Sequence, residues 1–191
     1  MNRWKILGKL SDAIAEVNRA GKKAELHIYS GSELDARKTQ KLNDGQNAFL
    51  HKAIPYGALA EEYRRSDIAV HVESFDLKNS LITRLSFSTK IIDCMNSGCA
   101  ILAIGPRTQA GISYLKENDA AVCVDSVQEV YTAVSRLIDE PELIRAYAGK
   151  ARALGIKNHL RVNIEKQIRQ DFSDTLSENF QNTQKEKLSR G

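Results

Sequence analysis

The sequence predicts an α/β protein in which helices cover both faces of a parallel sheet. Short runs such as IAVHV (68–72) and AILAI (100–104) are apolar along almost their whole length, which is typical of buried parallel strands. These runs alternate along the chain with segments whose apolar residues recur at helical spacing. Strands and helices that alternate in this way indicate a single parallel sheet of about five strands.

The first half of the chain carries signals for three helices and two strands. Apolar residues from Trp4 to Val17 recur at helical spacing, and Gly21 follows as a stop signal. Ser32 and Asp35 form a capping-box pattern that opens a short polar helix. The expected order is a helix over 4–17, a strand over 24–30, a helix to 42, a strand over 48–54 and a helix over 55–65.

The second half continues the alternation. Gly98 stands where glycine commonly follows a helix end, and Pro141 suits the first turn of a later helix. The polar segment 73–87 has weak periodicity. The expected strands are 68–72, 100–104 and 121–124, and the expected helices are 89–96, 109–118, 126–138, 141–154 and 161–172.

Length and composition limit the classes of protein that remain. The 191 residues suit one domain, expected over 1–172, and the polar tail 173–191 is expected to be frayed or disordered. The net charge is 28 − 24 = +4 without a basic run between aromatic residues, so a dedicated nucleic-acid binder is disfavoured while a small anionic ligand is compatible. No signal peptide or bilayer-spanning run is seen, and we expect a cytoplasmic protein, with membrane contact through a partner left open.

Three cysteines, Cys94, Cys99 and Cys123, lack the spacing of metal ligands, so free thiols in a reducing compartment are expected. No other cluster of His, Asp or Cys side chains with metal-binding spacing is seen, and we predict neither a metal nor a cofactor.

The segment 86–98 is the richest in groups that could bind a ligand. Parallel sheets bind ligands beyond the carboxyl ends of their strands, and this segment opens a helix there. A helix start offers free N–H groups to a phosphate, Ser88 and Thr89 add hydroxyl groups, and Lys90 adds a cation. Asp93, one turn further, could accept hydrogen bonds from a sugar diol. The alternative is ordinary helix capping by Ser86 or Ser88, with Lys90 in solvent.

The run SFSTKIIDCMNSGCAILAIGP (86–106) resembles the donor-binding segment of GT-B glycosyltransferases of the family 4 type. The preceding run SDIAV (66–70) is similar to that family's entry into a strand, and the resemblance extends over residues 4–159. It implies that the chain is the C-terminal, Rossmann-like half of a GT-B fold, without the first strand of that half. Loss of a central strand would leave sheet edges unpaired, so we expect low stability or self-association.

The resemblance also implies roles for particular residues. Asp93 would bind the ribose, and Ser86, Ser88, Thr89 and Lys90 would face the diphosphate of the donor. A basic residue early in such domains often neutralises the diphosphate, and Arg3 is the candidate here, with Lys5 second. No catalytic residue is assigned, because groups that activate the acceptor belong to the other half of such enzymes.

The sequence departs from the family pattern at one carboxylate. The family's paired glutamates would stand at 85 and 93, but position 85 is Leu85. Glu73, at the end of strand 68–72, could replace the missing carboxylate, or it could be a surface or capping residue. His71 and His27 are interpreted as packed strand histidines, and 75–85 as either a flap over the donor or a surface loop.

The implied activity is the transfer of a sugar from a nucleoside diphosphate sugar to a glycan or lipid-linked acceptor, as in polysaccharide biosynthesis. Retention of configuration and independence of metal are expected. The partners would be the nucleotide sugar and either an acceptor-domain chain or a second copy. The alternative is a module that binds a nucleotide sugar or docks on a partner without catalysis. A receiver-like domain is disfavoured, because Asp67 lies at the wrong end of its strand.

Overall fold

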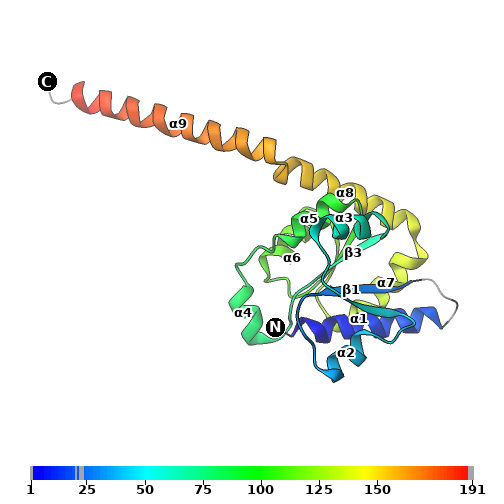
Figure 1. Ribbon diagram of the computed structural model, residues 1–191. Coiled ribbons are helices and arrows are strands. Elements are labelled where there is room, and N and C mark those ends of the chain that lie inside the picture. The colour runs from blue at the N-terminus through cyan, green and yellow to red at the C-terminus, as the bar shows by residue number, and fades with distance from the viewer. Residues whose placement is uncertain (1, 20, 22–23, 189–191) are drawn as a thin grey trace.

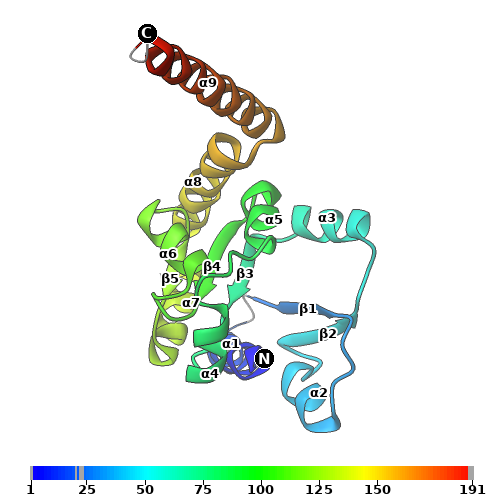
Figure 2. The same cartoon turned by 90° about the vertical axis from the view of Figure 1, so that its left-hand side faces the viewer.

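The computed structural model describes residues 2–19, 21 and 24–188, without the side chains of 178–188. Parallel strands form the centre of the described body, and helices pack around them (Figures 1 and 2). The strands are β1 (Leu26–Ser30), β2 (Ala48–Lys52), β3 (Ile68–Val72), β4 (Ala100–Ile104) and β5 (Val122–Val124). The helices are α1 (Arg3–Asn18), α2 (Ala36–Leu42), α3 (Tyr56–Arg64), α4 (Leu77–Thr83), α5 (Lys90–Ser97), α6 (Ala110–Glu117), α7 (Val130–Asp139), α8 (Pro141–His159) and α9 (Arg161–Leu188), and a 3-10 turn, η1 (Val127–Glu129), precedes α7.

Strand β4 lies at the centre of the core, and all five of its residues are buried. Its alternate side chains enter two different apolar clusters. Leu102 and Ile104 join residues of α1 and α7 on one face, whereas Ile101 and Ala103 join residues of α5, α6 and α8 on the other. The prediction of buried strands covered on both faces is therefore confirmed.

The expected single sheet is wrong for the described residues, because their strands form two sheets. Strand β1 pairs in parallel with β2, and β3, β4 and β5 form a separate parallel sheet in that order. The two sheets nevertheless share one core, since Leu26 and Ala48 pack in the same cluster as Leu102. Figure 2 shows the start of β1 beside β3, yet no described residue bridges the two strands by backbone pairing. The described residues thus contain no strand that pairs with both β1 and β3.

Several helix ends have the capping that the sequence indicates. Gly98 follows α5 with a φ of 86°, a conformation that strongly favours glycine. Asp35, rather than Ser32, caps α2 by accepting the backbone N–H of Lys38. Ser126 accepts the N–H of Gln128 at the turn before α7. The three cysteines are free thiols, as expected.

The C-terminal part of the chain is more helical than the sequence suggests. Helix α8 continues to His159, and α9 does not end near Phe172 but runs on to Leu188, where the sequence predicts a frayed tail. Residues 189–191 of that tail lie outside the described residues. Helix α9 projects away from the body (Figures 1 and 2). Among the described helices, none is long and apolar enough to span a bilayer.

The two unpaired strand edges predict self-association. The facing edges of β1 and β3 have no strand partner among the described residues, and N–H and C=O groups on such edges can pair with strands of another copy. In sedimentation velocity experiments, the weight-average sedimentation coefficient should rise with protein concentration. A compact monomer at every concentration would contradict this expectation.

Candidate functional site

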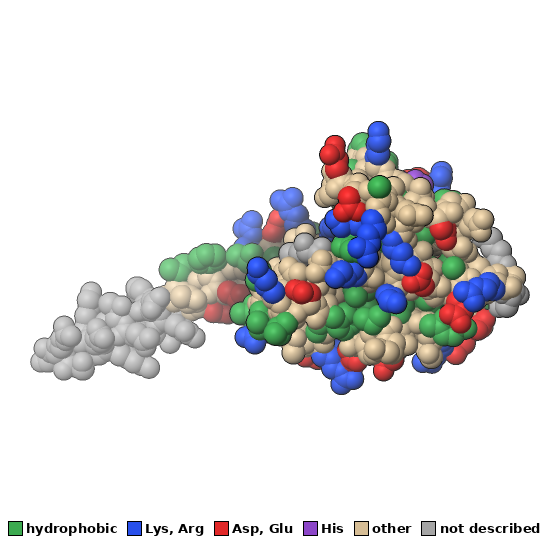
Figure 3. Space-filling view, turned by 90° about the horizontal axis from the view of Figure 1, so that it is seen from below, with side chains coloured by type: hydrophobic (Ala, Val, Ile, Leu, Met, Phe, Trp, Pro, Cys, Tyr) green, Lys and Arg blue, Asp and Glu red, His purple; other side chains and the backbone are tan. Residues whose placement is uncertain are grey.

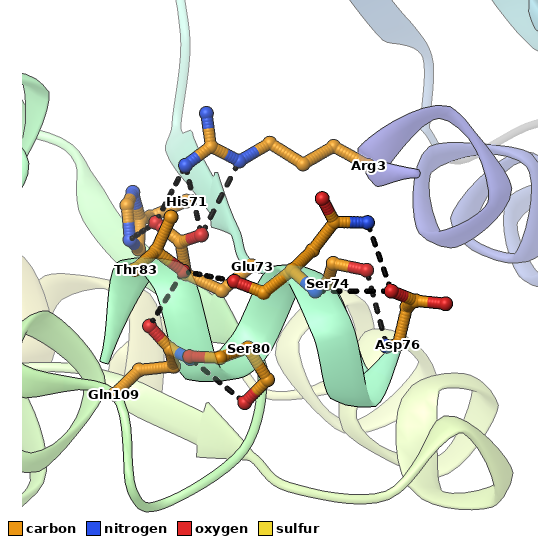
Figure 4. A network of polar contacts seen from close by, with 9 residues as sticks. Arg3, His71, Glu73, Ser74, Asp76, Ser80, Thr83 and Gln109 are labelled. Carbon is orange, nitrogen blue, oxygen red and sulfur yellow. Dashed lines mark hydrogen bonds and ion pairs between the residues drawn. The ribbon is translucent and has the colours of Figure 1, made fainter. Parts of the chain in front are cut away.

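Arg3 and Glu73, two of the predicted donor-binding residues, lie together at the carboxyl end of β3 (Figure 4). The Arg3 Nη2 atom lies 2.8 Å from both carboxylate oxygens of Glu73, and Nε donates to Oε2 at 3.3 Å. The Glu73 backbone N–H donates to the Ile104 carbonyl at 2.8 Å, which fixes the residue beside β4. Glu73 is 5% exposed, so its interpretation as a surface carboxylate is wrong.

His71 lies next to this ion pair and is 5% exposed, which confirms it as a packed strand histidine. Its Nε2 atom is 3.5 Å from Glu73 Oε1 and has no hydrogen-bond partner among the described residues. Burial raises the pKa of Glu73, but His71 and Arg3 outweigh it and hold that pKa below its ordinary value. The carboxylate is therefore charged at neutral pH. His27, in contrast, lies on the exposed face of β1, stacked on Phe49, and its interpretation as a packed histidine is wrong.

Two glycines allow the loop after β4 and the start of α6 to approach this point closely. A Cβ on Gly105 would lie 2.8 Å from Glu73 Cβ. A Cβ on Gly111 would overlap the end of the Ile91 side chain and lie 3.7 Å from His71 Nε2. The first turn of α5, the start of α6 and the end of β3 therefore meet at Gly111.

The segment 75–85 is not a simple surface loop, because it contains the docked helix α4. Asp76 caps this helix by accepting the Asn79 N–H. The buried Gln109 side chain donates at 2.9 Å to both the carbonyl and the hydroxyl of Ser80, and it accepts from Thr83 Oγ1 at 3.1 Å (Figure 4). The polar side of α4 is thereby held against the start of α6.

The first turn of α5 contains the other predicted residues and leaves its polar groups unused. The expected capping by Ser86 or Ser88 is absent, since Thr89 stands at the N-cap and no side chain caps the helix. The backbone N–H groups of residues 88–90 donate to no described residue. Lys90 is exposed and forms no ion pair with the described part of the chain. We call residues 88–90 the α5 tip.

Asp93 follows one turn after the α5 tip and is partly exposed. It accepts a hydrogen bond from the Tyr56 hydroxyl at 3.2 Å, and Asp93 in turn raises the pKa of Tyr56. Sequence reasoning did not identify Tyr56. Its position just after β2, at the same end of the strands as the α5 tip, was the available signal.

An aromatic cluster that sequence reasoning also missed anchors the chain before the α5 tip. The Phe87 ring packs edge-on against Tyr114 with centroids 5.3 Å apart and stacks on His159 at 5.9 Å. The Tyr114 hydroxyl and His159 Nε2 lie 2.9 Å apart. Burial lowers the pKa of His159, so this ring is neutral at neutral pH. Helices α6 and α8 thus hold Phe87 in place.

The predicted residues therefore form two groups rather than one. Arg3 and Glu73 pair with each other, while Ser86, Ser88, Thr89, Lys90 and Asp93 lie at and around the start of α5. Among the described residues, no hydrogen bond or ion pair joins the two groups directly, and Ile91 and His71 at Gly111 lie between them. Within the described ranges, no group of three or more His, Cys, Asp or Glu side chains is placed to hold a metal ion.

Comparison with known proteins identifies a family and a fold. A family model described as "Glycosyl transferase-like" matches residues 9–170. No curated protein sequence gives a significant match. Among solved structures, WaaG, a glycosyltransferase involved in lipopolysaccharide biosynthesis, matches with a TM-score of 0.62 and 13% identity. The match covers 84% of this chain but 40% of the WaaG chain, so this chain spans less than half of that protein's length.

The Arg3–Glu73 pair predicts a stability effect that depends on pH. Replacing Arg3 by Gln leaves a buried carboxylate without its cation and should lower the free energy of unfolding by roughly 2 kcal/mol at neutral pH. Because the pKa of Glu73 is lowered by folding, this stabilisation is present above the unfolded value of 4.5 and is lost as the pH falls through the folded pKa. Urea denaturation at several pH values measures the difference.

The exposed pair between Lys38 and Asp35 provides a matched control. Lys38→Gln should change the free energy of unfolding by less than about 1 kcal/mol. Equal effects of the two substitutions, or an Arg3→Gln effect that persists in acid, would contradict the assignment.

Proposed function

The chain belongs to the glycosyl transferase-like family, and we propose that it holds a nucleoside diphosphate sugar at the α5 tip for transfer of the sugar to an acceptor hydroxyl. The observation that carries this proposal is the set of unused polar groups at the α5 tip. Three backbone N–H groups, two hydroxyl groups and one ammonium group have no partner among the described residues. These groups are suited to an anion.

The diphosphate is the part of the donor that fits the α5 tip. The helix start carries a partial positive charge that favours phosphate oxygens. Ser88 and Thr89 add hydroxyl donors, Ser86 adds another just before them, and Lys90 adds a full charge. As the sugar leaves, negative charge grows on the diphosphate, and fixed donors of this kind stabilise it.

The ribose is assigned to Asp93, one turn further along α5. A carboxylate there accepts hydrogen bonds from the two ribose hydroxyls. Tyr56 already donates to Asp93 at 3.2 Å, and this bond orients the carboxylate before the donor arrives. Asp93 is partly exposed, so it is accessible to a ligand.

Arg3 and Glu73 take different roles from those that the sequence suggested. Glu73 is buried and neutralised, so we assign it to positioning Arg3 rather than to contacting the sugar. Its carboxylate engages Nε and Nη2 of Arg3 and leaves Nη1 without a partner among the described residues (Figure 4). The Arg3 side chain is 34% exposed, and Nη1 is the group that we assign to the diphosphate.

The reaction is proposed to retain configuration at the sugar and to need no metal. Helix-end N–H groups and the cations of Lys90 and Arg3 supply the positive charge that the leaving group needs. The acceptor site lies outside the described residues in this proposal, on a partner chain, on a second copy or on a further part of the protein. A glycan or lipid-linked acceptor is proposed by analogy with WaaG, which is involved in lipopolysaccharide biosynthesis.

A second candidate is a module that binds the nucleotide sugar without catalysis. One observation favours it: the chain spans 40% of the WaaG chain, and no described residue is identified as a general base. Release of nucleoside diphosphate from a bound nucleotide sugar, measured with the acceptor and with the chain or part that holds the acceptor site, separates the two. Turnover supports transfer, and tight binding without release supports the module.

The α5 tip predicts the effects of two substitutions on donor binding. Calorimetric titration with UDP-, GDP- and TDP-sugars should show binding of at least one of them. Lys90→Ala should remove a diphosphate contact and Asp93→Ala a ribose contact, each weakening binding by about 1.5–3 kcal/mol, or roughly 10- to 150-fold.

The exposed Lys157 on α8 supplies the control, and Lys157→Ala should bind like the natural chain. Addition of EDTA should leave the affinity unchanged, and a requirement for Mg²⁺ would overturn metal independence. If no nucleotide sugar binds, or if both site variants bind normally, the donor site is not at the α5 tip.

A further inference from the structure

A groove of about 510 Å³ lies between α1 and α2, away from the α5 tip. It is lined by Trp4, Lys5, Lys9, Arg37, Gln40 and Lys41, and no acidic residue is among these lining residues. The sequence shows no basic run, but the fold brings together cations from two segments some thirty residues apart. Figure 3 looks onto this side of the molecule and shows several basic side chains near one another, with some acidic side chains beside them.

Most of these cations have no anionic partner among the described residues. Lys41 pairs with Asp12, but Lys5, Lys9 and Arg37 form no ion pair with a described residue. Lys5 and Lys9 stand one helical turn apart, as do Arg37 and Lys41, and like charges at this spacing destabilise a helix. An external anion would relieve the repulsion.

The floor of the groove is apolar. A Cβ on Gly8 would lie 3.0 Å from two carbon atoms of Lys41, so the bare helix surface at Gly8 lets the lysine stem lie against α1. The Lys38 ammonium lies 5.9 Å from the centroid of the Trp4 ring. The groove therefore combines an aromatic ring and aliphatic stems with a basic rim.

Helix α4 adds exposed aliphatic side chains next to the start of α1. Leu77, Leu81 and Ile82 on α4 are exposed by 74%, 61% and 69%, and Leu85, just after α4, is exposed by 83%. We call these four residues the α4 stripe. Because Gln109 holds the polar side of α4 inward, the stripe faces outward. Lys78 and Arg84, beside the stripe, are exposed and form no ion pair with described residues.

The stripe and the groove lie on one side of the molecule. Figures 1 and 2 both place α4, the start of α1 and α2 along the same edge of the body. The Arg3–Glu73 ion pair connects the start of α1 to the chain that leads into α4. Aliphatic and basic side chains thus share a face.

We propose that this face lies on an anionic lipid bilayer. The α4 stripe would enter the interface, the cations would bind headgroup phosphates, and Trp4 would lie at the boundary, where tryptophan is favoured. A protein partner fits less well, because the cores of protein interfaces are depleted of lysine. The inference goes beyond donor binding and does not depend on it.

The single tryptophan of the chain makes the test direct. With the whole chain, vesicles of phosphatidylcholine and phosphatidylglycerol should shift Trp4 emission to shorter wavelength and carry the protein into the pellet. Pure phosphatidylcholine vesicles should do neither, and high salt should release the protein because it screens the charges.

Variants locate the surface. Lys5→Gln/Lys9→Gln/Arg37→Gln should weaken vesicle binding by at least about tenfold, since each cation near an anionic surface contributes to affinity. Leu81→Ser/Ile82→Ser should weaken it as well. The matched control, Lys157→Gln/Lys166→Gln/Arg169→Gln on α8 and α9, removes three exposed cations and should bind as before.

Four outcomes would overturn the proposal. Three concern vesicles: no binding to anionic vesicles, equal binding to neutral vesicles, or variants that bind vesicles normally. The fourth is a Trp4 emission shift produced equally by soluble glycerol phosphate, which would indicate a site for free phosphates. A stripe variant that alters only the size of the protein in solution would indicate a protein interface instead. Nucleotide-sugar titration without vesicles tests the donor site separately, so the two failures are distinguishable.

Discussion

Burial of β4 on both faces is the constraint on which the rest of the structure depends. A strand with five buried residues needs an apolar layer on each side, and the two clusters around Leu102 and Ile101 provide them. This requirement places α5 and α6 on one face and α1 and α7 on the other. The helix starts then meet at the carboxyl end of the strands, and Gly105 and Gly111 let them approach each other closely. The position of the α5 tip is thus a consequence of core packing.

Charge is distributed unequally over the edge of the protein where the carboxyl ends of the strands lie. The buried Glu73 carboxylate is paired with Arg3, while Arg3 Nη1 has no partner among the described residues. The α5 tip, in contrast, presents N–H groups, hydroxyl groups and Lys90 without a matching anion among the described residues. A protein that only needed stable helix ends would cap α5 with Ser86 or Ser88, and this one does not. The unmatched positive end is the reason to look for an anionic ligand there.

The sequence predicted the elements whose pattern is local and strong. The apolar runs of β3 and β4, the glycine after α5 and the polar α5 tip all follow from a few neighbouring residues. Partnerships between distant residues could not be predicted, such as Arg3 with Glu73, Tyr56 with Asp93, or Phe87 with His159. Helix α4 was missed because its leucines face outward, which obscures the pattern of a packed helix. The continuation of α9 was not predicted, because this part of the helix packs against little of the core. Its sequence therefore lacks the apolar repeat of a packed helix.

The described strands form two sheets, and β1 and β3 do not pair with each other. The α5 tip packs beside the three-stranded sheet, and Tyr56, which follows β2 of the other sheet, donates to Asp93. The central proposal is that the N–H groups of residues 88–90 bind the diphosphate of a nucleotide sugar. Amide hydrogen exchange, measured residue by residue with and without a nucleotide sugar, tests this most directly. If these groups bind a diphosphate, exchange at Ser88, Thr89 and Lys90 should slow on binding, with no change along α9. Binding that leaves these three amides unprotected, while others become protected, would contradict it.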